Sequence, residues 1–453
     1  MGKLIRQKKN DTKPVLSQSG FTLYSVLILI SIVTIYFSAI LTDIHYLQKQ
    51  TINQNHESQA KLLAKSGITR AEYFLNGADG HDMNWETDKY EEQIDDYGKI
   101  QIKAEKFGLF SRIISKGIKL DTEYTLSGLY GRGVPGILNP SLTLTGHVGG
   151  LILKGGSDIE NLIVLHHGEI YREKRGKPLT DYRKRLINKI SPSLPFDSTV
   201  IPDLMNNLDK DFKYMLSNKY KKTVNPDSND NKKSTIIIIK GDFTIDSIVN
   251  NNELFISGKL VLNDGASVND SKIYCSETVI YNGLTQRSLF YCANRLQIAG
   301  GIHNSQFFCR DSVIVKNKAQ FKRMNVIAGY RQIEGDTAVK GGICFENGCS
   351  ITGTVISCQE TVSKNIITGP SIVIGKKSVV NGVLVTDRDI EFMDVEIMGH
   401  VWVRSVVCND EGKSYTNYII RSKIKGGEEE IFPMLGGMPV FVRTDCWRKL
   451  RKN

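Results

Sequence analysis

The feature that most constrains the fold of this 453-residue chain is a repeat of 17 residues in its second half. Four consecutive segments fall into register, at residues 254–270, 271–287, 288–304 and 305–321. One column of the register holds Ile256, Ile273, Phe290 and Phe307, and another holds Gly258, Cys275, Cys292 and Cys309. Because side chains two apart in a strand share a face, the pattern predicts short strands that each bury one face.

Units of this length that stack on their own copies predict a right-handed parallel β-helix, a solenoid in which each coil buries its apolar face only against its neighbours. We expect the β-helix at residues 235–409, with its first coils at residues 136–167 and a C-terminal cap at residues 410–453. Residues 168–234 are polar and basic, which predicts a partly helical insertion on the side of the solenoid. A solvated face is the default interpretation of its charges, and a phosphate- or surface-binding role is the alternative.

A second constraint is the only long apolar segment, Phe21–Leu41, which contains 21 residues without a charge. At ~1.5 Å per residue it is long enough to cross a ~30 Å hydrocarbon layer as a helix. Five basic residues precede it, so the positive-inside rule places the N-terminus in the cytoplasm and the remaining chain across the membrane. A cleaved secretory signal peptide is the alternative, disfavoured because the apolar run exceeds the usual ~7–15 residues.

The junction before this segment reads Ser-Gln-Ser-Gly-Phe-Thr-Leu at residues 17–23. A polar, basic leader that ends in glycine before an aromatic-led apolar helix resembles the class III signal of type IV pilins and type II secretion pseudopilins. The resemblance implies that residues 1–20 are a leader cut after Gly20, and that Phe21 becomes the N-methylated first residue. It also implies three partners: a prepilin peptidase, an inner-membrane assembly platform, and other pilin or pseudopilin subunits.

One position departs from the family pattern. Family members usually carry glutamate as the fifth mature residue, and this chain has Ser25 there. In the family this buried carboxylate is thought to pair with the terminal amine of a neighbouring subunit. K-type minor pseudopilins, which cap the filament tip, also lack the glutamate, so the departure narrows the resemblance to minor subunits.

Residues 42–77 continue the helical pattern beyond the membrane, and residues 78–135 are expected to be a linking region. The segment around residues 59–68 resembles a stretch that follows the anchor in X-type and K-type minor pilins. Its packing face holds Ala60, Leu63, Ala64, Gly67, Ile68 and Ala71. Two interpretations stay open: small residues on this face allow neighbouring helices to approach closely, or the face packs on the chain's own domain.

All eight cysteines lie at or after position 275. We interpret Cys275, Cys292 and Cys309 as buried thiols of one ladder, although adjacent coils would bring their Cα atoms close enough for a disulfide. Cys344 and Cys349 are the better candidates for a disulfide. No C-x-x-C pair, phosphate loop or other catalytic motif is found, so the sequence predicts no catalytic residue and no cofactor.

Two further groups were considered as metal or catalytic sites. His166 and His167 are adjacent in a segment expected to be extended, where their rings would point to opposite faces. The second group is acidic and also includes Asp394 and Glu396; its alternating members Asp387, Asp389 and Glu391 would share one solvated face. Neither group predicts a metal site.

These features favour a structural subunit over an enzyme. We expect a single-pass cytoplasmic-membrane protein with a mainly-β ectodomain in the periplasm or outside the cell, acting as a minor pilin or pseudopilin at a filament tip or priming complex. A membrane-anchored glycan-binding or polysaccharide-processing β-helix is one alternative, and an envelope protein whose leader is never cut is another. The net charge of +11 is spread without a basic helix or an aromatic stripe, so no nucleic-acid partner is expected.

Overall fold

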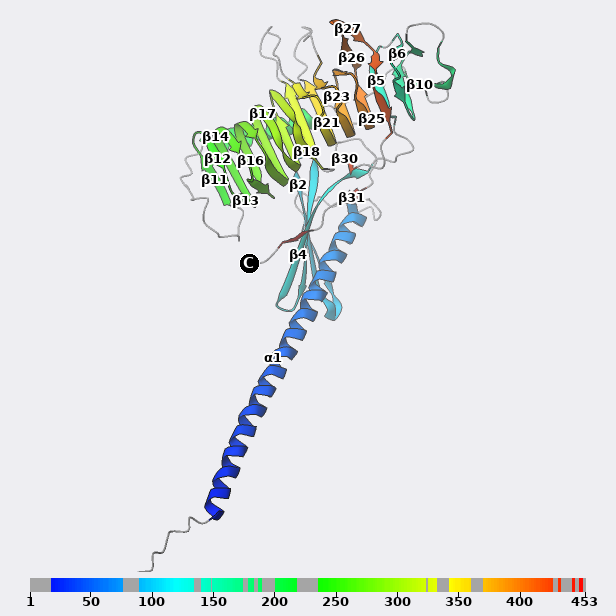
Figure 1. The fold of residues 1–453 in the computed structure, drawn as a ribbon. Helices are drawn as coiled ribbons and strands as arrows, with labels where there is room; N and C mark the ends of the chain where they lie inside the picture. The colour runs from blue at the N-terminus through cyan, green and yellow to red at the C-terminus, as the bar shows by residue number, and fades with distance from the viewer. Residues whose placement is uncertain are drawn as a thin grey trace, which may run out of the picture.

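One long helix followed by a mainly-β body makes up the chain, as the sequence predicts, in the computed structural model (Figure 1). Described are residues 18–75, 89–133, 140–147, 149–173, 178–182, 186–189, 200–217, 235–322, 325–331, 342–359, 370–426, 431–432, 442–444 and 448–450. Residues 1–17 of the predicted leader, which spans residues 1–20, lie outside these ranges.

The first body is helix α1 (Gln18–Leu75) with an antiparallel sheet against its C-terminal part. The sheet strands run in the order β1 (Lys89–Ile94), β2 (Gly98–Phe107), β3 (Phe110–Lys119) and β4 (Thr122–Gly133), with the short 3-10 helix η1 (Asp95–Tyr97) between the first two. The predicted linking region at residues 78–135 is therefore mostly a folded sheet. The alternation of Ile100, Ile102 and Ala104, all buried, was the available sequence signal.

The second body is a stack of parallel-paired strands, called the stack below. Its main run consists of β11 (Thr235–Ile239), β12 (Phe243–Ile245), β13 (Ile248–Asn250), β14 (Asn252–Leu262), β15 (Ser267–Asn269), β16 (Lys272–Ile280), β17 (Gly283–Cys309), β18 (Ser312–Phe321), β19 (Val326–Arg331), β20 (Gly342–Phe345), β21 (Ser350–Gln359), β22 (Ile372–Ile374), β23 (Val379–Thr386), β24 (Asp389–Phe392), β25 (Glu396–Val403) and β26 (Ser405–Asp410). Strands pair in parallel with later strands, as β14 does with β16, β16 with β17, β21 with β23 and β23 with β25, so successive segments of the chain lie on one another.

The 17-residue register holds for the first part of β16 and β17, where Ile273 pairs with Phe290 and Cys275 pairs with Cys292, and it shifts by one residue after Cys275. The first column of the repeat needs a correction. Ile256 pairs with Cys275, whereas the partner of Ile273 is Leu254, and after a register shift between Ile256 and Lys259 the partner of Lys259 is Glu277. Strand β14 is thus two residues out of the predicted alignment before this shift and one residue out after it.

The segment at residues 140–189 stacks on the opposite end from the one expected. Its strands are β5 (Leu142–His147), β6 (Leu151–Lys154), β7 (Asp158–Ile159), β8 (Ile163–His166), β9 (Ile170–Arg172) and β10 (Leu186–Asn188), with the 3-10 helix η2 (Thr180–Tyr182) before the last. Val401 of β25 pairs with Leu142 of β5, which in turn pairs with Ile163 of β8. These coils therefore extend the stack beyond its last C-terminal coil, and β10 belongs to the stack although it lies inside the predicted insertion.

The residues after position 410, predicted to be a cap, pair with both bodies of the protein. The strands β27 (Lys413–Thr416), β28 (Tyr418–Ile420) and β29 (Lys423–Lys425) join the same end of the stack, where β28 pairs with β6 and β29 pairs with β25. The last strands, β30 (Ile431–Phe432), β31 (Val442–Thr444) and β32 (Arg448–Leu450), return to the antiparallel sheet and pair with β4. The chain end is thus tied to the first body.

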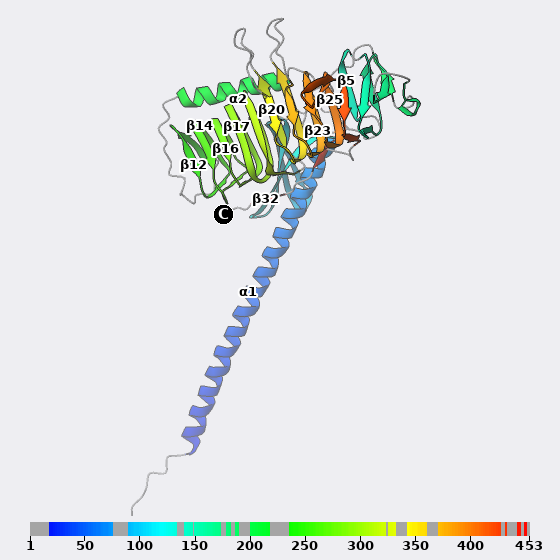
Figure 2. The ribbon, with the colours of Figure 1, turned by 45° about the horizontal axis from the view of Figure 1, so that its top comes forward.

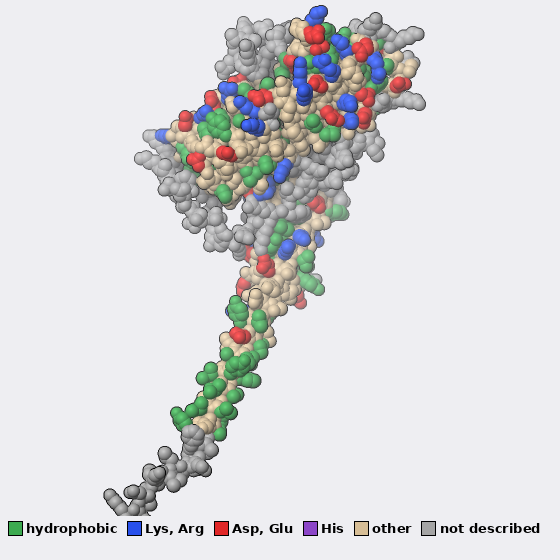
Figure 3. All heavy atoms as spheres, in the orientation of Figure 1, with side chains coloured by type: hydrophobic (Ala, Val, Ile, Leu, Met, Phe, Trp, Pro, Cys, Tyr) green, Lys and Arg blue, Asp and Glu red, His purple; other side chains and the backbone are tan. Residues whose placement is uncertain are grey.

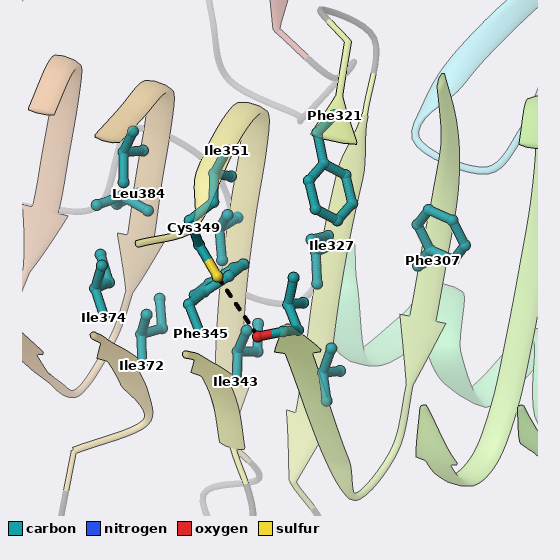
Figure 4. Packing of buried hydrophobic residues seen from close by; sticks show 14 of the residues in the cluster. Phe307, Phe321, Ile327, Ile343, Phe345, Cys349, Ile351, Ile372, Ile374 and Leu384 are labelled. Carbon is teal, nitrogen blue, oxygen red and sulfur yellow. Dashed lines mark hydrogen bonds between the residues drawn. The ribbon is translucent and has the colours of Figure 1, made fainter. Parts of the chain in front are cut away.

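Alternate residues of each strand fill the interior of the stack (Figure 4). Phe307, Ile327, Phe345 and Ile351 are each at most 1% exposed, and the rings of Phe290 and Phe307 stack at 5.1 Å between centroids. One corner is held by hydroxyls, because Ser288 accepts a hydrogen bond from the Ser271 backbone N–H at 3.1 Å and Ser305 accepts one from Ser288 at 3.2 Å. Each coil thus satisfies a backbone donor of its neighbour.

The helix α2 (Val200–Ser217), which the polar stretch contains as expected, lies along one face of the stack (Figure 2). Under it is a column of outward apolar side chains, in which Phe255 pairs with Tyr274 and Tyr274 with Tyr291. Met205, Leu208 and Phe212 of α2 are buried in the same cluster as these rings. The sequence signal for this contact was the aromatic residue in the middle of each triplet, Phe255, Tyr274 and Tyr291. These side chains point outward, where a solvent-facing residue would be polar.

Candidate functional site

The N-terminal part of α1 projects from the body and exposes its apolar side chains (Figure 3). Leu23, Ile35 and Phe37 are between 62% and 71% exposed. Within the described part of the chain, α1 is the one helix long and apolar enough to cross a membrane by length and composition. The exposed apolar surface fits a lipid or protein environment better than water.

Polar side chains inside this apolar segment have internal partners. The hydroxyl of Ser31 donates to the Leu27 carbonyl at 2.9 Å, and that of Thr34 donates to the Ile30 carbonyl at 2.8 Å. Such bonds to the preceding turn satisfy hydroxyls where no water is available. These two hydroxyls are therefore compatible with a hydrocarbon environment.

The residues of the predicted cleavage junction lie at the start of the helix. Gly20 and Phe21 are within the first turns of α1, and Ser25 is exposed one turn later. The side chain at this position is therefore a neutral hydroxyl.

The predicted packing face of α1 contacts the chain's own sheet. Ala60, Ala64, Ile68 and Ala71 are fully buried and belong to one cluster with residues of β2, β3 and β4. The small residues allow a close approach, since a Cβ added at Gly67 would lie 2.7 Å from Ile100 Cγ2. The structure thus favours the second of the two interpretations, packing on the chain's own domain.

The antiparallel sheet is joined to the stack by a buried amide. The Gln306 side chain, 1% exposed, accepts a hydrogen bond from the Leu109 N–H at 2.8 Å and donates one to the Phe107 carbonyl at 2.8 Å. Both partners lie at the turn between β2 and β3. The tight turn at Gly108, with φ +62°, lets the backbone approach this amide.

The helix α2 is held on the stack by the buried carboxylate of its own residue Asp209. Asp209 accepts hydrogen bonds from Tyr291 Oη at 2.9 Å and from Arg310 Nη1 at 2.8 Å, and Lys213 lies 2.7 Å away. Burial opposes ionisation of Asp209, but Lys213, Tyr291 and Arg310 outweigh it and hold the pKa of this carboxyl below its usual value. The network explains how a carboxylate is tolerated under α2.

The cysteine ladder is buried and consists of free thiols. Cys275, Cys292 and Cys309 are fully buried, and the sulfurs of the first two are 3.8 Å apart. Burial raises the pKa of the Cys292 and Cys309 thiols well above the usual value, so both stay protonated. These thiols act as small apolar side chains.

The candidate disulfide is not formed. Cys344 is exposed and Cys349 is buried, and both are free thiols. Burial raises the pKa of the Cys349 thiol to about 12, and its sulfur lies 3.6 Å from the Val315 carbonyl oxygen (Figure 4). Alternation in β20 explains the difference, because Cys344 lies between the inward-facing Ile343 and Phe345.

The alternating acids are engaged in local contacts. Arg404 binds Asp389 through two nitrogens at 2.9 and 2.6 Å, and Glu391 accepts a hydrogen bond from Asn409 at 2.7 Å. A carboxylate held by a bidentate guanidinium is a poor general acid or base. Among the described residues, no group of three or more His, Cys, Asp or Glu side chains is placed to hold a metal ion.

The histidine pair differs from its prediction in one respect. His167 has a positive φ of 51°, so the segment is not extended there, and the His166 and His167 ring centroids are 5.3 Å apart. The reason given for rejecting the pair as ligands therefore does not hold.

Comparison of the chain with protein-family models, curated proteins and solved structures finds no match.

Proposed function

We propose that the protein is a minor pilin or pseudopilin-like subunit of a type IV pilus or type II secretion filament. The observation that carries the proposal is the division of α1 into two parts. Its N-terminal part is apolar, exposed and uncovered by any described residue, whereas its C-terminal part is buried on the sheet. An exposed apolar helix of this kind suits a subunit that is held in the membrane before assembly and then packs into a filament through the same helix.

The length of the helix supports more than simple tethering. A helix of 58 residues is about 87 Å long, and a ~30 Å hydrocarbon layer needs only ~20 of them. Residues 42–59 are helical and mostly exposed, so they hold the body well away from the membrane surface. We infer an N-terminus in the cytoplasm and a body in the periplasm or outside the cell.

We further propose that the stack is a right-handed parallel β-helix. The supporting observations are the parallel pairings of each coil with the next and the continuous apolar interior. The stack lies across the end of α1 (Figure 1). A large transverse body is difficult to repeat along a tightly packed fibre, so we place the subunit at the tip or in the priming complex.

The test of this proposal is the N-terminus of the membrane-extracted protein from its native host. Intact mass and N-terminal sequencing should find a chain that begins at N-methylated Phe21. A Gly20→Val variant should keep its leader, because a bulky side chain takes the place of glycine beside the cleaved bond, and Ser19→Ala is the matched control that should be cut. A wild-type chain that retains Met1 would remove the filament assignment.

A further inference from the structure

Three histidine side chains meet at the end of the stack that is formed by β5 and β8. His147 lies directly opposite His166 in the parallel pairing, and their ring centroids are 5.4 Å apart with the planes at 83°. His167 lies next to His166 at 5.3 Å, with the planes at 39°. His166 therefore has two imidazole neighbours at similar distances.

Two departures from regular strand geometry bring these rings together. Regular pairing would continue from Leu144 and Leu165 to Thr145 and His166, but the register shifts and places His147 opposite His166. His167 takes the left-handed backbone conformation that non-glycine residues seldom adopt. Irregularities of this kind re-aim side chains and are often found at functional positions.

The environment of the rings leaves them available to a ligand. His147 and His167 are exposed, and His166 is partly buried. Within the part of the chain that the structure describes, no hydrogen bond to any of the three rings is formed. Neutral imidazole nitrogens without a partner are the preferred ligands of Zn²⁺, Cu²⁺ and Ni²⁺.

The spacing agrees with coordination of one ion by two rings. With metal–nitrogen bonds of ~2.0–2.1 Å and a tetrahedral angle, two imidazole centroids lie ~5 Å apart. We propose that His166, together with His147 or His167, chelates a borderline divalent ion such as Zn²⁺ or Cu²⁺. Two protein ligands leave the other coordination positions to water, which makes the site open and exchangeable.

The experiment uses the purified full-length chain in detergent. Titration with ZnCl₂ by calorimetry should show one site per chain, and MgCl₂ should give no heat because Mg²⁺ prefers oxygen ligands. His166→Gln removes the shared ligand, as does the double variant His147→Gln/His167→Gln, so each should weaken Zn²⁺ binding at least ~10-fold. Either single variant keeps one pair and should lose less.

Two controls distinguish a loss of Zn²⁺ binding at this site from a loss of folding and from Zn²⁺ binding at other histidines. The variants should unfold near the wild-type temperature without metal, since His147 and His167 are exposed and His166 is only partly buried. His45 and His56 of α1 remain in every variant, so their background is constant. The electron paramagnetic resonance spectrum of the Cu²⁺ complex should show two nitrogen ligands. Zn²⁺ binding by His166→Gln equal to that of wild type, or a single nitrogen in the spectrum, would overturn the inference.

Discussion

Two histidines are buried in the stack, and their hydrogen bonds explain how they are tolerated there. His303 Nε2 donates to the Gly300 carbonyl at 2.9 Å, and Nδ1 lies 3.1 Å from the Thr285 hydroxyl. The ring also contacts Phe307 at 5.7 Å between centroids. Burial lowers the pKa of His303 to about 4 and lowers that of His400 as well. Both rings are therefore neutral in the folded protein near neutral pH.

The stack should lose stability on acidification through His303. Its folded pKa lies below the unfolded value of 6.5, so the unfolded state binds the proton more tightly. The free energy of unfolding should thus be unaffected by His303 above pH ~6.5 and fall by about 3 kcal/mol as the pH drops to ~4. Urea unfolding followed by circular dichroism from pH 7.5 to 4 measures this loss. His303→Gln removes the titrating group, and an identical pH profile for wild type and this variant would contradict the assignment.

At the scale of elements, the close contact between α1 and the sheet depends on glycine, which has no side chain. A Cβ added at Gly117 of β3 would lie against the Ala60 carbonyl oxygen and 2.5 Å from the Ala64 backbone nitrogen. Backbone atoms of a helix cannot move aside as a flexible side chain does. Gly117 therefore sets the distance at which α1 lies on the sheet.

Gly117→Ala should weaken the first body. Overpacking typically costs about 1–3 kcal/mol, and here the obstacle is backbone on one side and sheet on the other. Chemical denaturation of the full-length chain should show the loss, together with faster hydrogen exchange at Ala60–Ala71. Gly329→Ala is the matched control, because the nearest atom to its added Cβ is Ile343 Cγ1 at 3.2 Å, in a side chain that can adjust. Equal stability of the two variants would mean that α1 can shift freely on the sheet.

Elements that repeat or alternate were predictable, and those defined by long-range pairing were not. The α1 segment and the register from Cys275 to Cys292 follow from local periodicity. The first segment was misaligned because β14 pairs with β16 at two different offsets, before and after the shift between Ile256 and Lys259, and unequal offsets leave no fixed period in the sequence. The His166–His167 contact was missed for a related reason, since a single positive φ reverses the expected direction of a side chain.

At the scale of the whole molecule, the path of the chain is the least predictable feature. From the sheet, the chain first builds the far end of the stack with β5–β10, and the main run then begins at the opposite end with β11. The last strands pair with β4, so the first body is completed only by the end of the sequence. Each of these contacts joins segments separated by hundreds of residues, and composition carries no information about which coil end meets which.

The same arrangement predicts how much of α1 the body needs. A chain that begins at residue 50 keeps the buried face at Ala60–Ala71 and loses only exposed turns, so its free energy of unfolding should match that of the full chain within ~0.5 kcal/mol. A chain that begins at residue 70 also lacks Leu63 and Ile68 and uncovers the sheet, which should cost about 5 kcal/mol from lost apolar burial. Denaturant unfolding of both truncations, with light scattering to detect association, shows which part of α1 stabilises the body and which part can be removed without loss of stability. If the chain from residue 50 unfolded as readily as the chain from residue 70, the exposed part of α1 would have to stabilise the body directly.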